Sequence, residues 1–143
     1  MNTIEDELAL RNLMARYVDA VNRSDEKAWA ATWAEDAVWN LLGTPVSGRG
    51  NIVGLWQQMM GSFEFALMMP NSCLFDVDGD TASGHWYLHE YTRDAEGTGT
   101  TILSRYLDTY IKQDGEWLFQ SRDYNFIYNG PSDLSGSYTA PPS

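Results

Sequence analysis

One stretch carries many of the side chains in this chain that are able to do chemistry. It runs from Gly84 to Tyr91 with the sequence GHWYLHEY. Because side chains alternate across a strand, Trp86, Leu88 and Glu90 share one face, and the histidines and tyrosines share the other. Glu90 therefore lies on the more apolar face. It is either a buried carboxyl group with a shifted pKa, able to move a proton, or an edge residue that reaches water.

The opposite face of the same stretch is aromatic and carries both histidines of the chain: His85, Tyr87, His89 and Tyr91. We interpret it as an outer surface or a subunit contact. A face of this kind is seldom left in water, so we expect a homodimer or homotrimer.

Neither a metal nor an organic cofactor is expected. Two histidines on one alternating face with scattered acids do not make a compact ligand set. The segment Gly43–Gly48 continues with Arg49 and Gly50, where a phosphate-binding loop needs Lys and Ser or Thr.

Composition restricts the class of partner. The 143 residues suffice for one domain, and 20 acids against 9 bases give a net charge of -11. Without a Lys/Arg cluster, this balance argues against nucleic-acid and membrane surfaces and favours a hydrophobic small molecule. There is no apolar run near membrane-spanning length and only one cysteine, which predicts a cytoplasmic protein without internal disulfides.

The elements that position these residues begin with helices. Apolar residues at helical spacing predict a helix over about 4–22, with Thr3 and Asp6 at its start. A second helix is predicted from Asp25 to near Ala34, and a third over about 52–61. A short strand, 37–41, lies between the second and the third.

Two hairpins follow the helices. Asp78-Gly79 separates strands 72–77 and 81–92, and Asp114-Gly115 separates strands 101–113 and 116–128. Helices followed by hairpins predict an α+β domain over residues 1–128, with the helices packed on one face of an antiparallel sheet. Residues 129–143 are rich in Gly, Pro and Ser and are predicted to be a disordered tail or an arm on a neighbouring subunit.

Four segments resemble the SnoaL-like branch of the NTF2-like superfamily: Tyr17–Asp25, Trp33–Trp39, Val77–Tyr87 and Asp114–Trp117. The resemblance implies a cone, in which three N-terminal helices pack on a strongly curved antiparallel sheet around a central pocket. Members include scytalone dehydratase, a bile-acid dehydratase and a lindane dehydrochlorinase, beside proteins without catalytic roles, so the fold alone does not assign a function.

The family's Asp-His pair is absent at the matching positions. Asn22 stands where these enzymes have the Asp, and Leu67 stands where they have the His. Leucine cannot move a proton, and an amide does not stabilise an imidazolium as a carboxylate does. The chain is therefore not expected to run the family's His-based elimination.

The resemblance also implies which residues face the pocket. From the strands these are Trp86, Leu88, Glu90, Ser104, Tyr106 and Asp108. Tyr17 matches a pocket tyrosine of the bile-acid dehydratase, and Glu90 matches an acid there. Glu90 near Tyr17 or Tyr106 would pair a general base with a phenolic donor, and Asn22 and Asp108 would position the substrate.

Structural roles remain open for several of these residues. Tyr17 is otherwise a core residue, and Asp108 is otherwise a surface ion-pair partner of Arg105 or Arg122. Arg122 and Tyr124 reach the pocket rim if a β-bulge turns them inward, where the arginine would hold a substrate oxygen.

The favoured function is a cofactor-independent lyase or isomerase of the dehydratase, cyclase or retro-aldol type. Its substrate would be hydrophobic, aromatic or polycyclic. The alternative is a non-catalytic small-molecule-binding or assembly protein on the same fold, which the missing Asp-His pair favours.

Overall fold

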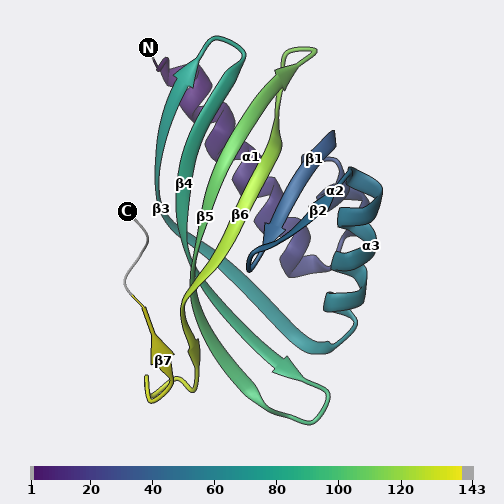
Figure 1. Cartoon of the computed structure of the whole chain (residues 1–143), viewed down its shortest axis with the longest axis vertical. Helices are drawn as coiled ribbons and strands as arrows, with labels where there is room; N and C mark the ends of the chain where they lie inside the picture. The colour runs from purple at the N-terminus through teal and green to yellow at the C-terminus, as the bar shows by residue number, and fades with distance from the viewer. Residues whose placement is uncertain (1, 140–143) are drawn as a thin grey trace.

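The computed structural model describes residues 2–139. The helices are α1 (Ile4–Arg23), α2 (Glu26–Ala30) and α3 (Arg49–Met60). The strands are β1 (Trp33–Leu41), β2 (Thr44–Ser47), β3 (Phe63–Asp78), β4 (Thr81–Asp94), β5 (Gly99–Gln113), β6 (Glu116–Gly130) and β7 (Ser137–Tyr138). This is the predicted α+β order of helices followed by two long hairpins (Figure 1).

Helix α1 begins and ends close to where its sequence predicts. The Thr3 side chain accepts a hydrogen bond from the Asp6 backbone N–H at 3.0 Å. At the other end, Ser24 takes a left-handed conformation with φ of 53°, and its N–H caps the last turn. The apolar side of α1 packs against β3 and β6.

Helix α2 is shorter than predicted, because Thr32 and Trp33 do not continue it. The Thr32 hydroxyl bonds back to the Trp29 carbonyl at 2.7 Å, and the Thr32 carbonyl accepts the Phe119 N–H at 2.9 Å. Trp33 then begins β1, beside Phe119 of β6. A bulky aromatic residue is compatible with a strand, so pairing with β6 decides that Trp33 belongs to a strand and not to α2.

The sheet is curved, with the strand order β2-β1-β6-β5-β4-β3 and with β7 added to β6 (Figure 1). The prediction of a wholly antiparallel sheet is wrong, since β1 runs parallel to β6. Hairpin signals fix direction only between strands that follow one another along the chain. β1 and β6 are far apart in sequence, so no local signal reports their direction.

The alternation predicted for β4 is present. Trp86 and Leu88 are buried in the core with α1, and Tyr87 and His89 lie on the outer face. Trp33, Trp39 and Trp117 belong to the hydrophobic core and are all at most 3% exposed.

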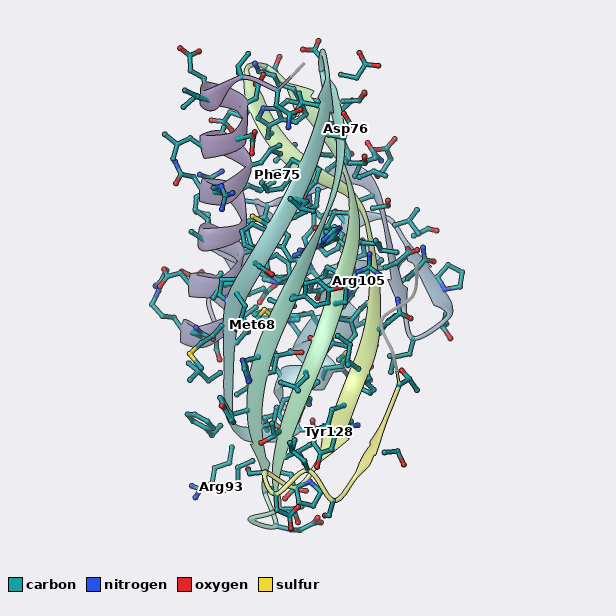
Figure 2. The ribbon with its side chains drawn as sticks, turned by 90° about the vertical axis from the view of Figure 1, so that its left-hand side faces the viewer. Met68, Phe75, Asp76, Arg93, Arg105 and Tyr128 are labelled. Atoms are coloured by element: carbon teal, nitrogen blue, oxygen red, sulfur yellow. The ribbon has the colours of Figure 1, made fainter. Side chains whose placement is uncertain are left out.

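The segment after Tyr128 is more ordered than predicted over the part that the structure describes. β6 continues to Gly130, and Ser137–Tyr138 pairs with Tyr128 and Asn129 of the same chain. The Tyr128 hydroxyl donates to the Pro131 carbonyl and accepts the Gly136 N–H, which folds the segment back (Figure 2). Within residues 2–139, no helix is long and apolar enough to cross a bilayer.

Candidate active site

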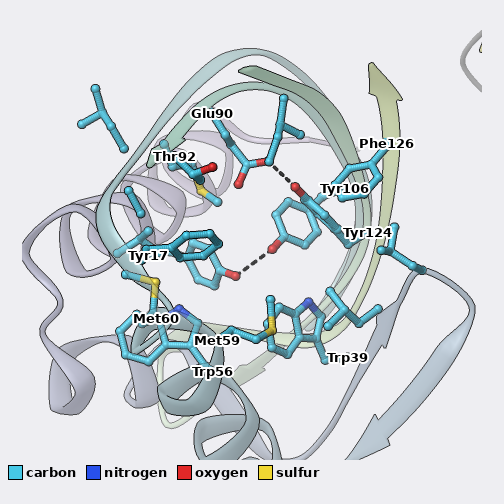
Figure 3. Close-up of a pocket in the computed structure, with 18 residues that line it drawn as sticks. Tyr17, Trp39, Trp56, Met59, Met60, Glu90, Thr92, Tyr106, Tyr124 and Phe126 are labelled. Carbon is cyan, nitrogen blue, oxygen red and sulfur yellow. Dashed lines mark hydrogen bonds between the residues drawn. The ribbon is translucent and has the colours of Figure 1, made fainter. Parts of the chain in front are cut away.

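A cavity of about 170 Å³ lies between α1, α3 and the inner face of the sheet (Figure 3). Its wall is mainly aromatic and aliphatic and includes Trp39, Trp56, Met59, Met60, Ile102 and Phe126. Among the lining residues of the described chain, Glu90 is the one with an acidic or basic side chain. Any ionic chemistry in this cavity therefore depends on Glu90.

Glu90 is held by two hydroxyl groups from neighbouring strands. The Ser104 Oγ donates to Glu90 Oε2 at 2.7 Å, and the Tyr124 hydroxyl donates to the same oxygen. Both bonds go to Oε2, and Figure 3 shows the carboxyl group facing the cavity, so Oε1 is placed to meet a ligand. Glu90 is half-buried, and its carboxyl group is paired with two hydroxyl groups at the cavity wall.

The environment of Glu90 favours its protonated form more than water does. Burial raises the pKa of Glu90, while the hydrogen bonds from Tyr124 and Ser104 act in the opposite direction. The net shift is upward. A carboxylate with a raised pKa is a stronger base once it is ionised, which suits proton transfer.

Two tyrosine hydroxyls lie beside Glu90 in the cavity. The Tyr17 and Tyr106 oxygens are 2.9 Å apart and share one hydrogen bond, in which either group can be the donor. Each hydroxyl carries one proton, so the pair has a second proton to donate to a ligand. Burial raises the pKa of both phenols, which keeps them protonated as donors.

A buried ion pair between Arg122 and Asp108 lies against the rings of Tyr17 and Tyr106. Arg122 Nε and Nη2 donate to the two Asp108 oxygens at 2.7 and 2.9 Å, and the Tyr110 hydroxyl donates to Asp108 at 2.8 Å. The guanidinium carbon lies 3.6 Å from the centre of the Tyr106 ring and 4.5 Å from that of Tyr17. This positive charge stabilises negative charge that develops on the phenol oxygens.

The structure corrects the roles open for this pair. Arg122 and Asp108 are at most 3% exposed, so they do not form a surface pair, and neither lines the cavity. Burial alone would lower the pKa of Arg122, but Asp108 raises it, and the net shift is upward. Arg122 is thus a fixed cation behind the tyrosines and not a rim residue that touches the ligand.

Asn22 and Leu67 have structural surroundings that differ from the catalytic pair they replace. Asn22 Nδ2 donates to the Met68 carbonyl at 2.9 Å, and Asn22 Oδ1 accepts the Met68 N–H at 2.7 Å. This pair of hydrogen bonds fixes α1 to β3. Asn22 was expected to position the substrate, but it does not line the cavity. Leu67 does line it and adds apolar wall.

The remaining predicted residues divide between cavity and core. Tyr124 lines the cavity, whereas Ser104 is fully buried behind Glu90. Trp86 and Leu88 face inward but lie outside the lining, because β4 runs past the cavity toward the core, where Trp86 packs on Phe75. Sequence reasoning missed Trp39, Trp56 and Ile102 as cavity residues, since their apolar character fits core and pocket wall equally well.

The described residues bring together no group of three His, Cys, Asp or Glu side chains that could hold a metal ion. The two outer-face histidines pack beside tyrosines, and His85 meets Tyr87 edge-on with ring centres 5.6 Å apart. The His89 and Tyr91 rings are 6.1 Å apart and nearly parallel, on the side of β4 opposite Glu90.

Replacing Tyr124 with Phe should raise the pKa of Glu90 further, because the lost hydrogen bond stabilises the ionised form. If the reaction needs the carboxylate, the acidic midpoint of its pH–rate profile should move to higher pH than in the wild type. The pH dependence of the rate measures this shift. Tyr128→Phe, whose hydroxyl bonds to Pro131 away from the cavity, is the control and should leave the profile in place. A downward shift in Tyr124→Phe would contradict the assignment.

One family model matches this chain. The model of the SnoaL-like domain matches residues 2–123. A search of curated proteins found no significant match. Among solved structures, a candidate aromatic ring hydroxylase from Novosphingobium aromaticivorans is 27% identical, with a TM-score of 0.85 over 96% of each chain.

Two further structures are similar in fold at lower identity. A candidate scytalone dehydratase from Novosphingobium aromaticivorans is 17% identical, with a TM-score of 0.85 over 98% of this chain and 96% of that one. The hexachlorocyclohexane dehydrochlorinase LinA-type3 from Novosphingobium barchaimii is 20% identical, with a TM-score of 0.82 over 97% of both chains. With the family model covering most of its length, this chain belongs to the SnoaL-like domain family.

Proposed function

We propose that the protein is a cofactor-independent lyase or isomerase that acts on a hydrophobic small molecule. The carrying observation is the Glu90 carboxyl group, with its raised pKa, facing an apolar cavity beside the paired hydroxyls of Tyr17 and Tyr106. Similarity in fold to a dehydrochlorinase and to a candidate scytalone dehydratase supports the reaction class.

The proposed reaction begins with proton abstraction next to a carbonyl group. Glu90 Oε1 takes the proton, the C–H electron pair forms the C=C bond of an enolate, and the negative charge moves to the carbonyl oxygen. The free proton of the Tyr17–Tyr106 pair donates a hydrogen bond to that oxygen. Glu90 then returns the proton to another carbon, which is isomerisation, or a neighbouring leaving group departs, which is elimination.

Deuterium uptake tests this proposal without knowledge of the natural substrate. The protein is incubated in D₂O with one-ring and two-ring ketones, and exchange at the carbon beside the carbonyl is followed by proton NMR. We expect exchange above the protein-free rate for at least one ketone that binds. Binding across the panel without exchange would favour the second candidate.

That second candidate is a non-catalytic binding protein. It is favoured by the positions of the family's Asp-His pair, where Asn22 is engaged with the Met68 backbone and Leu67 forms apolar wall. The same cavity would then hold its ligand by apolar contact, with Glu90 fixed by its two hydroxyl donors as a polar anchor.

We also propose that the outer sheet face associates into a homodimer or homotrimer. Leu74 and Phe65 of β3, at 69% and 49% exposed, extend the aromatic face of His85 to Tyr91. Light scattering at micromolar concentration should give a mass above 16.2 kDa. Leu74→Glu should shift that mass toward the monomer, whereas Leu42→Glu, exposed on the β1–β2 turn, should leave it unchanged. A monomeric wild type would contradict the proposal.

A further inference from the structure

Trp39 presents a hydrogen-bond donor that has no acceptor in the part of the chain that the structure describes. Its indole Nε1–H is buried, and Trp39 itself is 3% exposed. An indole N–H can only donate, and buried donors in native proteins are nearly always paired. The group can therefore donate to an acceptor from outside the chain wherever its position lets one reach it.

Trp39 differs from the other tryptophans with unpaired indole nitrogens in its position at the cavity wall. Trp29, Trp33 and Trp86 also have buried, unpaired indole nitrogens, but none of them lines the cavity, and Trp39 does. Figure 3 shows the Trp39 ring on the side of the cavity opposite Glu90, with the hydroxyls of Tyr17 and Tyr106 between them. The Trp39 ring packs at 5.6 Å from Trp29 and 6.0 Å from Trp33, which fixes its orientation.

The lining of the cavity limits what can supply the acceptor. Its volume of about 170 Å³ accommodates at least one ring with a short substituent, and a larger ligand can extend past the half-exposed Leu42 at its edge. Among the described lining residues there is no Lys or Arg to pair with an anion, and Glu90 would repel one. The fitting ligand is thus apolar apart from one acceptor and carries no negative charge.

We infer that Trp39 recognises the substrate oxygen through its indole N–H, and that the substrate is an apolar carbonyl compound without an anionic group. This inference rests on the proposed function, because the bound molecule is a substrate only if the protein is the proposed enzyme. The carbonyl oxygen accepts from Trp39 and from the tyrosine pair, which leaves the adjacent C–H toward Glu90.

Paired ligands test the inference by binding alone. Acetophenone and ethylbenzene have similar size and shape, but only acetophenone carries the acceptor. By calorimetry, the wild type should bind acetophenone more tightly. Trp39→Phe should weaken acetophenone roughly 3- to 10-fold, as expected for one hydrogen bond, and leave ethylbenzene nearly unchanged. The matched control is Trp86→Phe, which removes a buried indole outside the cavity that packs on Phe75, and it should preserve the preference.

The indole signals give a direct second readout. In ¹⁵N-labelled wild type, the Trp39 Nε1–H resonance should move downfield with acetophenone and stay nearly still with ethylbenzene. Trp39→Phe assigns the signal, and if that variant does not fold, contacts to the Trp29 and Trp33 rings assign it. Equal affinity for the two ligands, no binding of acetophenone, or an unmoved Trp39 signal would overturn the inference.

Failure of the inference and failure of the proposed function look different. An acetophenone-specific Trp39 shift without deuterium exchange in any ketone would remove the catalytic proposal and leave the recognition by Trp39. Exchange with an unmoved Trp39 signal would do the reverse.

Discussion

Glu90→Gln should slow proton exchange into a bound ketone by roughly 10²- to 10⁴-fold. The glutamine has the shape of the glutamate, and its carbonyl oxygen can accept the hydrogen bonds that Ser104 and Tyr124 now donate to Oε2. What it lacks is the ability to take up and return a proton. The loss should therefore fall on the rate of exchange, with ligand affinity changed little.

The comparison for this variant is Glu116→Gln, an exposed glutamate at the start of β6. It removes the same charge from the chain without touching the cavity, so its exchange rate should equal that of the wild type. Full activity in Glu90→Gln would place the base elsewhere and remove the mechanism proposed above.

Arg122→Met should lower the free energy of unfolding by about 3 to 5 kcal/mol, because it leaves Asp108 buried without its cation. The Met side chain fills part of the space but offers no donor to the two Asp108 oxygens. Urea unfolding measures the change. The double variant Arg122→Met, Asp108→Asn should recover part of the loss, since no unpaired charge then remains.

An exposed ion pair provides the contrast for Arg122. Arg93 and Glu64 are 3.1 Å apart with side chains 54% and 52% exposed. Arg93→Met should change stability by less than about 1 kcal/mol. If Arg122→Met were as mild as Arg93→Met, the buried pair would not be a structural support of the site.

Local signals in the sequence predicted much of the fold. The two Asp-Gly turns fixed the hairpins β3–β4 and β5–β6, and the spacing of two along β4 placed Glu90 on the inner face. Both signals act between residues that are neighbours along the chain, which is why they can be read without a structure. The parallel pairing of β1 with β6 depends on distant segments and has no such signal.

The candidate site was predictable in its centre and less so at its edges. Glu90, Tyr17 and Tyr106 were expected together and lie around one cavity. The pair of hydrogen bonds between Asn22 and the Met68 backbone and the stacking of Arg122 beneath Tyr106 were not foreseen. Both depend on side-chain directions across α1, β3 and β6, which residue type and spacing do not determine.

The central claim is that Glu90 is the group that transfers the proton. The most direct measurement follows the Glu90 carboxyl carbon by ¹³C NMR as a function of pH and compares its titration with the rate of deuterium exchange. Because burial raises the pKa of Glu90, its titration should lie above the ordinary value of 4.5, and the exchange rate should rise with the same midpoint. An exchange rate that does not follow the ionisation of Glu90 would contradict the account.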